Sequence, residues 1–169
     1  MVASLVKEND TLILDSGSTN LGVGKALSSL NKITVLTNDL EIALHTAKFP
    51  SIKTIFAGGE VRPLIFSCYG PLTENYFNNL VVEKLFLGAE SIDFKRGITN
   101  AQINEANLKQ KMIECAKEII VVADSSKFDK SSLAFVCDFS KINAVVSDSK
   151  IPKPYINFFK EKGIKLYLV

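Results

Sequence analysis

Short apolar runs recur along the chain, and each one ends in small or polar residues. Amphipathic stretches of helical length lie between the runs. Continuous apolar runs of this kind predict strands buried on both faces, as in a parallel sheet that is covered by helices on both sides. The expected strands are residues 11–14, 33–36, 52–57, 84–89, 119–123, 142–146 and 164–169. We therefore expect an α/β fold with an open, mostly parallel, Rossmann-like sheet and helices on both faces.

The stretches between the runs predict helices. These cover residues 20–30, 39–48, 72–80, 103–117 and 152–162. Two stretches are less regular: residues 61–69 contain Pro63 and predict only a short extended segment, and residues 90–100 predict a polar loop. With 169 residues, the chain is expected to form one domain, residues 1–169, large enough to bury a substantial core.

The charge pattern limits which partners the chain itself can have. Basic and acidic residues number 20 and 18, they are interspersed, and the formal net charge is +2. A chain that binds nucleic acid by itself carries a basic face, and the sequence predicts none. No apolar run approaches the ~20 residues that span a bilayer, and the first residues lack the pattern of a secretory signal. We therefore expect a cytoplasmic protein whose own surface binds neither DNA nor a membrane.

The three cysteines, Cys68, Cys115 and Cys137, are widely spaced and form no CxxC pair. An odd number without that spacing argues against a disulfide framework and against a zinc site. Free thiols in the core or on helix surfaces are the expected state. Neither a metal nor another cofactor is predicted, because the chain also lacks a Walker A loop and the GxGxxG order of a dinucleotide site.

The turn of Asp15, Ser16, Gly17, Ser18 and Thr19 joins the first expected strand to the first expected helix. In open parallel sheets, ligands bind beyond the carboxyl ends of the strands. A glycine-centred turn that runs into a helix aims free N–H groups and the positive end of the helix dipole at an anion. The turn therefore predicts a phosphate site. Alternatively, Ser18, Thr19 or Asn20 simply caps the helix, and the turn alone does not decide.

Glu105 and Lys109 stand one helical turn apart in the expected helix of residues 103–117, inside its apolar arc. An exposed pair of this spacing contributes only ~0.2–0.5 kcal/mol. Placing both charges on the buried side of the helix costs more than that, unless each charge has a partner. One interpretation is a charged pair that lines a polar pocket. The other is an internal salt bridge that fixes the helix to the sheet.

Three other ionisable side chains have two interpretations each. Lys127 follows a strand end and two serines, where its ammonium either reaches a phosphate or stays in solvent. His45 lies inside a helix, away from every strand end, and is expected to be a helix residue rather than a catalytic base. Arg62 follows a Gly-Gly pair and contacts either a ligand or a neighbouring subunit; the sequence leaves both open.

Several short motifs occur in one order along the chain. They are Asp15-Ser16-Gly17-Ser18-Thr19, Leu36-Thr37-Asn38, Ala57-Gly58-Gly59, Leu87-Gly88-Ala89, Gly97-Ile98-Thr99, Glu105-Ala106 followed by Lys109, Met112 and Ile113, and Asp124-Ser125-Ser126-Lys127-Phe128. Each motif is weak alone, but the set in this order resembles the C-terminal sensor domain of DeoR-type bacterial transcriptional regulators. The resemblance covers residues 4–148.

The resemblance implies a fold related to ribose-5-phosphate isomerase, glucosamine-6-phosphate deaminase and CoA transferases. It also implies a phosphorylated sugar as effector and assembly into a homodimer or tetramer. Operator DNA would be bound only through an N-terminal winged helix-turn-helix, which is absent from this chain. Regulators of this kind usually act as repressors, although these residues do not themselves reveal the direction of regulation.

The resemblance also assigns ligand-binding residues. The turn of residues 15–19 would hold the phosphate together with Lys127, and Asn38, Gly58 and Gly59 would shape the wall. Glu105 and Lys109 would face the sugar hydroxyls or the carbonyl end, as relics of the proton-transfer chemistry of the related isomerases. A sensor without catalytic residues is the leading hypothesis. A sugar-phosphate isomerase with Glu105 as its base is the alternative.

Overall fold

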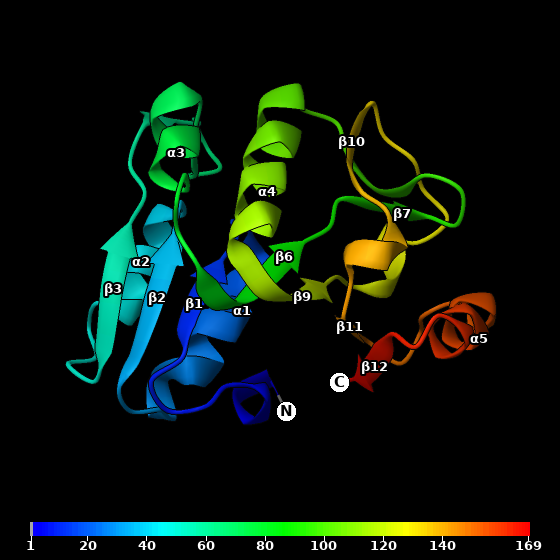
Figure 1. Ribbon diagram of the computed structural model, residues 1–169, viewed down its shortest axis with the longest axis horizontal. Helices are drawn as coiled ribbons and strands as arrows, with labels where there is room; N and C mark the ends of the chain where they lie inside the picture. Colours follow the sequence, from blue (N-terminus) through cyan, green and yellow to red (C-terminus); the bar gives the residue numbers. More distant parts are fainter. Residues whose placement is uncertain (1) are drawn as a thin grey trace.

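A parallel sheet forms the centre of the molecule (Figure 1), as seen in the computed structural model, which describes residues 2–169. Its seven strands follow the order β12-β11-β9-β6-β1-β2-β3. They are β1 (Thr11–Leu14), β2 (Ile33–Thr37), β3 (Ile52–Phe56), β6 (Val82–Gly88), β9 (Ala116–Val122), β11 (Ala144–Ser147) and β12 (Lys165–Leu168). Every neighbouring pair is parallel. The parallel α/β sheet predicted from the apolar runs is therefore confirmed.

The strand order reverses beside β1. From β1 the chain moves outward through β2 to β3, and it then returns to the other side of β1 to form β6. Leu14, the last residue of β1, lies opposite Thr37 of β2 and Phe86 of β6. A reversal of this kind leaves a crevice at the carboxyl ends of the two strands whose connections diverge. In this chain those strands are β1 and β6.

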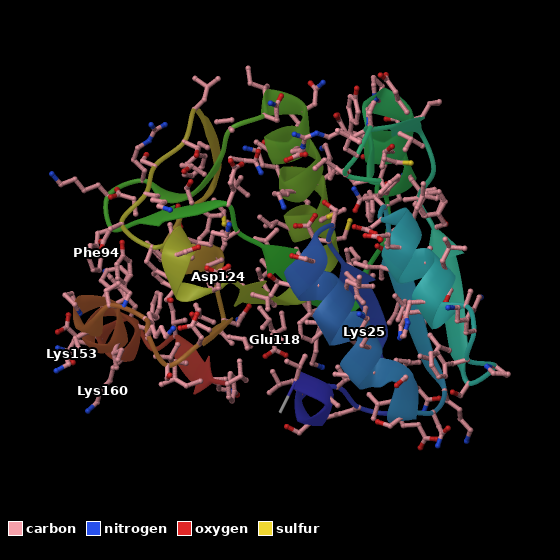
Figure 2. All side chains as sticks on the ribbon, turned by 180° about the vertical axis from the view of Figure 1, so that it is seen from behind. Lys25, Phe94, Glu118, Asp124, Lys153 and Lys160 are labelled. Carbon is pink, nitrogen blue, oxygen red and sulfur yellow. The ribbon has the colours of Figure 1, made fainter. Side chains whose placement is uncertain are left out.

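Helices cover both faces of the sheet (Figures 1 and 2). One face carries α1 (Ser18–Ala26), α2 (Leu40–Thr46) and the short 3-10 helices η1 (Val2–Leu5) and η2 (Leu27–Ser29). The other carries α3 (Pro71–Tyr76), α4 (Ile103–Cys115) and α5 (Lys153–Glu161). Successive side chains of β1 point to opposite faces of the sheet. Leu12 and Leu14 pack in the core of the first face, and Ile13 packs in the core of the second.

The polar loop predicted for residues 90–100 is wrong. That stretch holds β7 (Ser91–Asp93) and β8 (Gly97–Asn100), which pair antiparallel; β10 (Ala134–Cys137), which was not predicted, completes a three-stranded sheet in the order β10-β8-β7. The Asp93 carboxylate shapes the turn by accepting bonds of 2.9 Å from two following backbone N–H groups. Strands this short carry too little alternation to be told from a turn-rich loop.

A short hairpin confirms the extended segment expected in residues 61–69. It consists of β4 (Glu60–Val61) and β5 (Cys68–Tyr69). The N–H of Arg62 donates to the carbonyl of Ser67 at 2.8 Å, which closes the loop, and Leu64 and Phe66 take φ values of 67° and 61° inside it. The compact loop holds Arg62 in a fixed place.

Several helix ends differ from the prediction, most of all the end of α1, which lies at Ala26 instead of residue 30 because the 3-10 helix η2 follows. α1 begins at Ser18, ahead of the expected residue 20. α3 ends at Tyr76, ahead of the expected residue 80. α4 ends at Cys115 because Ala116 is already extended, with φ −98° and ψ 137°, and starts β9. Two more 3-10 turns, η3 (Ser125–Lys127) and η4 (Phe139–Lys141), follow β9 and β10.

Aromatic rings join the antiparallel sheet to α5. Phe94, beside β7, stacks on Tyr155 of α5 with ring centroids 3.8 Å apart (Figure 2). Phe128 meets the same Tyr155 edge-on at 4.8 Å. Burial raises the pKa of Tyr155 to about 12, and its hydroxyl donates to the carbonyl of Ile92 at 3.2 Å. This packing fixes the antiparallel sheet against the rest of the molecule.

The cysteines are free and buried, as predicted, and all three lie in the core rather than on helix surfaces. Among residues 2–169, no helix is both long enough and apolar enough to cross a membrane.

Candidate functional site

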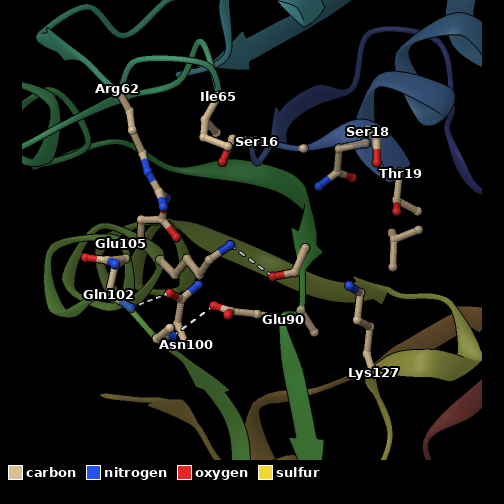
Figure 3. Close-up of a pocket in the computed structure, with 17 residues that line it drawn as sticks. Ser16, Ser18, Thr19, Arg62, Ile65, Glu90, Asn100, Gln102, Glu105 and Lys127 are labelled. Atoms are coloured by element: carbon tan, nitrogen blue, oxygen red, sulfur yellow. Dashed lines mark hydrogen bonds and ion pairs between the residues drawn. The ribbon is translucent and has the colours of Figure 1, made fainter. Parts of the chain in front are cut away.

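A pocket of about 370 Å³ lies where the strand order reverses (Figure 3). Its walls come from the turn between β1 and α1, the end of β6, the passage from β8 into α4, and the connection after β9. The β4–β5 loop adds Arg62 and Ile65. This volume is typical of a small-molecule site. The pocket brings together the following predicted site residues: Ser16, Gly17, Ser18, Thr19, Glu105, Lys109 and Lys127.

The turn before α1 leaves donors free. Gly17 has φ 115° and ψ 162°, a conformation that essentially only glycine adopts. No side chain caps α1, so the capping interpretation of Ser18, Thr19 or Asn20 is wrong. The Gly17 N–H donates to Asp39 Oδ2 at 3.0 Å, whereas the first N–H groups of the helix itself have no intrahelical partner. The exposed hydroxyls of Ser18 and Thr19 stand beside them.

The Asp15 side chain is buried beneath the turn and does not line the pocket. Its side chain is 2% exposed. The carboxylate accepts from the N–H of Ser16 at 2.8 Å and of Gly88 at 2.9 Å, and it also contacts the ammonium of Lys109. Lys109 in turn donates to the carbonyl of Gly88 at 3.0 Å. The internal salt bridge that fixes α4 to the sheet is therefore present for Lys109.

Glu105 pairs with Arg62 and not with Lys109. The Arg62 guanidinium, from the β4–β5 loop, contacts the Glu105 carboxylate of α4, and the two side chains are 33% and 19% exposed. Figure 3 shows this pair at one side of the pocket, opposite Lys127. The sequence left Arg62 open between a ligand and a neighbouring subunit, and the structure places it in the pocket wall. Both charges in the apolar arc of α4 are thus matched from other elements.

Lys127 is partly exposed at the end of η3 and lines the pocket. Its ammonium forms no hydrogen bond or ion pair with any group in residues 2–169. Two carboxylates hold the turn that carries it: Asp124 accepts from Ser126 N–H at 2.8 Å, and Asp148 accepts from Ser125 N–H at 2.7 Å. Hydrogen bonds from the side chain and the N–H of Ser126 lower the pKa of Asp124, to which the charge of Lys127 adds, and the bond from Ser125 N–H lowers the pKa of Asp148.

Asn38, Gly58 and Gly59 do not line the pocket. Asn38 Nδ2 donates to the carbonyl of Cys68 at 2.8 Å, and the carbonyl of Gly58 accepts from Thr73 Oγ1 at 3.1 Å. A Cβ added at Gly59 would come within 2.1 Å of Thr73 Oγ1. These contacts tie the segment around the β4–β5 hairpin to its neighbours, so they act on the pocket through the positions of Arg62 and Ile65.

Sequence reasoning missed four polar residues of the pocket: Asn20, Glu90, Asn100 and Gln102. Glu90 Oε2 accepts from Ala101 N–H and Asn100 Oδ1 accepts from Gln102 N–H, both at 2.9 Å. The residues after β6 were available to the rule that places ligands at strand ends. The rule does not reach Asn100, because the sequence predicts a loop where the structure has β8.

Asn20 is the most unusual of the four. It is 1% exposed, yet neither Nδ2 nor Oδ1 has a hydrogen-bond partner within residues 2–169. A signal existed in the sequence, since Asn20, Val23, Gly24 and Leu27 share one helix face and all are buried in the structure.

His45 lies on α2, outside the pocket, and burial lowers its pKa. Within residues 2–169, no group of three or more His, Cys, Asp or Glu side chains is placed to hold a metal ion. The side chains that line the pocket offer hydrogen bonds and charges.

The fold matches that of a known enzyme. Ribose 5 phosphate isomerase A from Neisseria gonorrhoeae superposes with a TM-score of 0.52 over 78% of this chain and 50% of the isomerase, at 16% sequence identity. At this identity the match shows the fold alone, and it confirms the predicted relation to the ribose-5-phosphate isomerase fold.

Curated relatives match along almost the whole chain. The transcriptional repressor AccR of Agrobacterium fabrum is 37% identical, over 100% of this chain and 66% of the repressor. The HTH-type transcriptional regulator GolR of Listeria innocua is 30% identical, over 96% of this chain and 64% of the regulator. The chain thus spans less than two thirds of the length of either relative. Both relatives are transcriptional regulators by name.

The family model described as the DeoR C terminal sensor domain matches residues 1–149. That range contains all the residues that line the pocket. This chain belongs to the DeoR C-terminal sensor domain family.

Proposed function

We propose that the chain is the effector-binding domain of a bacterial transcriptional regulator, and that its pocket binds a phosphorylated sugar. The observation that carries the proposal is Lys127, a pocket cation without an ion-pair partner among residues 2–169, which Figure 3 places on the same side as Ser18 and Thr19. Free N–H groups at the start of α1 add to these donors. One ammonium, two hydroxyls and a helix start form a binding site for a phosphate group.

The opposite side of the pocket suits the sugar. Arg62, Gln102 and Glu105 lie there, away from Lys127 (Figure 3). Carboxylates accept hydrogen bonds from hydroxyls, and amide and guanidinium groups donate to them. A volume of about 370 Å³ has room for a sugar together with its phosphate.

The proposal extends to the rest of the protein. The relatives are longer than this chain, and one of them is an HTH-type regulator by name. We propose that this chain works with an N-terminal helix-turn-helix that binds operator DNA, within a homodimer or tetramer. Residues 1–169 would act as one sensor domain. The effector produces a signal only if it binds the two conformations of the regulator with different affinity.

An isomerase is the competing function, because the fold is shared with ribose 5 phosphate isomerase A. A base for isomerisation has to reach a carbon-bound proton of the substrate. Glu105 is the candidate, and it is already engaged by the Arg62 guanidinium. This engagement favours recognition over proton transfer.

A thermal-shift panel of sugar phosphates, followed by an isomerase assay on each ligand that binds, tests the proposal. We expect stabilisation without turnover; a ligand at 100 times its Kd adds ~2.7 kcal/mol to the free energy of unfolding. Turnover that disappears in Glu105→Gln would establish the enzyme instead. If neither sugar phosphates nor inorganic phosphate stabilises the protein, the pocket is not a phosphate site.

A further inference from the structure

The Asn20 side-chain amide has no hydrogen-bond partner in the part of the chain that the structure describes. The residue is 1% exposed and lines the pocket, and both Nδ2 and Oδ1 lack a partner within residues 2–169. Buried side-chain amides in proteins are nearly always hydrogen-bonded, so each exception calls for an explanation. The neighbouring Ser18 and Thr19 point their hydroxyls to the exposed side of the same turn.

Three of the groups beside Asn20 already have partners: the N–H and carbonyl of Gly88 and the carboxylate of Asp15. A Cβ added at Gly88 would lie 3.4 Å from Asn20 Nδ2, so the amide stands directly beside the Gly88 backbone. The N–H of Gly88 donates to Asp15, and its carbonyl accepts from Lys109. The Asp15 carboxylate already accepts from Ser16, Gly88 and Lys109. The pocket is the side from which a partner can come.

We propose that Asn20 is the residue that selects the effector, by binding two adjacent hydroxyl groups of the sugar next to the phosphate. This inference rests on the proposed function of the pocket. An amide presents one acceptor and one donor side by side. A vicinal diol matches both, because one hydroxyl donates to Oδ1 while its neighbour accepts from Nδ2. The effector class is therefore a phosphate ester with a vicinal diol.

Phosphate alone does not match the amide. The dianion of a phosphate ester offers only acceptors, so it bonds Nδ2 and leaves Oδ1 without a donor. Asn20 is thus a poor member of the phosphate site formed by Ser18, Thr19 and Lys127, although it belongs to the same helical turn as the two hydroxyl residues. The proposal therefore assigns phosphate binding to Ser18, Thr19 and Lys127, and hydroxyl binding to Asn20 of the same helical turn.

The test compares inorganic phosphate with four vicinal-diol phosphates: ribose 5-phosphate, glucose 6-phosphate, fructose 6-phosphate and glycerol 3-phosphate. Calorimetry gives each Kd for the parent, for Asn20→Leu, and for the control Asn107→Leu, which changes an exposed asparagine of α4 outside the pocket. Leucine has nearly the shape of asparagine and makes no hydrogen bond. We expect Asn20→Leu to weaken the tightest diol phosphate by roughly tenfold or more, the effect of two hydrogen bonds. Inorganic phosphate should bind as before, and Asn107→Leu should match the parent.

The other outcomes overturn the inference in distinct ways. If Asn20→Leu weakens inorganic phosphate as much as the diol phosphate, Asn20 belongs to the phosphate site. If neither ligand changes, the hydroxyls are bound elsewhere. If the parent binds no phosphate at all, the proposed function itself fails. The melting temperature of ligand-free Asn20→Leu is the control for folding: we expect no loss, since no hydrogen bond is removed, and a marked fall means that the amide is structural. Asn20→Ala repeats the binding test if leucine does not fit.

Discussion

The ammonium of Lys109 on α4 contacts the carboxylate of Asp15 at the end of β1, across 94 positions of sequence. Both side chains are almost completely buried, at 7% and 2% exposure. The contact ties a helix on one face of the sheet to the turn that begins the pocket. Its role is to place the turn, because Asp15 is out of reach of a ligand.

Replacing Lys109 by methionine is expected to lower the free energy of unfolding by about 3–5 kcal/mol, because the Asp15 carboxylate stays buried without its partner. Urea denaturation measures the change. Lys111→Met is the matched control: it breaks an exposed pair with Glu114 on the same helix and should cost no more than ~0.5 kcal/mol. Equal stability of the two variants would contradict the assigned role of the buried pair.

Removing the Lys127 ammonium is expected to weaken phosphate binding. Hydrogen bonds to charged groups contribute about 1.5–3 kcal/mol, so Lys127→Ala should raise the Kd of the best phosphate ligand by roughly 10- to 100-fold. Calorimetry measures the Kd. Lys153→Ala removes the same charge from α5, outside the pocket, and should leave the Kd unchanged. If Lys127→Ala binds the phosphate ligand as tightly as the parent, the phosphate is bound elsewhere.

The turn glycine should tolerate no side chain, although there is space for one. Nothing lies within 4 Å of a Cβ at Gly17, yet φ is 115°. Gly17→Val should therefore cost about 1–3 kcal/mol of strain, or shift the turn and abolish phosphate-dependent stabilisation. Gly22→Ala is the control, since that glycine also has free space but ordinary helical φ, and it should stabilise by up to ~1 kcal/mol. Undiminished phosphate binding in Gly17→Val would rule out the turn as the site.

Acid should weaken the turn that carries Lys127. Hydrogen bonds from Ser126 to Asp124, and from the backbone at Ser125 to Asp148, lower both pKa values below the ordinary 3.8. A lowered pKa in the folded state contributes stability that is present above 3.8 and is lost as the pH falls through the folded pKa. The melting temperature should therefore hold from neutral pH to near 4 and decline below. Asp148→Asn should show a shallower decline; an identical decline would assign the loss to other carboxylates.

The thiols should be inert in the folded protein. Burial raises the pKa of Cys68 and Cys115, and it raises that of Cys137 to about 12. Since the thiolate is the reactive form, a chromogenic disulfide at pH 8 should label no cysteine rapidly, and all three after unfolding in guanidinium. Immediate reaction of one native thiol would show that its surroundings open.

The sequence predicted the parallel sheet because its central strands are apolar on both faces, as Leu12, Ile13 and Leu14 illustrate. It did not predict β7, β8 and β10, because runs of three or four residues carry no reliable period. The strand-end rule then found the turn of residues 15–19 but not Asn100, whose strand was missing.

The pairing of charges was only half predictable. Helical phase showed that Glu105 and Lys109 point inward, but their partners, Arg62 and Asp15, are distant in sequence. Such contacts depend on how the elements pack, and a single sequence does not encode them locally. Asn20 was considered as a cap, whereas the buried face that it shares with Val23 and Leu27 was the better guide.

The charge pairing also affects which ligand occupies the pocket. Arg62 is matched by Glu105 and Lys109 by Asp15, which leaves Lys127 and Glu90 as charges of opposite sign on an almost neutral surface. Long-range attraction of anions is weak at such a surface. If the pocket binds as we propose, its occupancy follows the supply of one metabolite and not the total phosphate of the cell. Under this proposal abundant polyanions compete poorly, because the pocket selects its ligand by shape and hydrogen bonding and not by charge attraction.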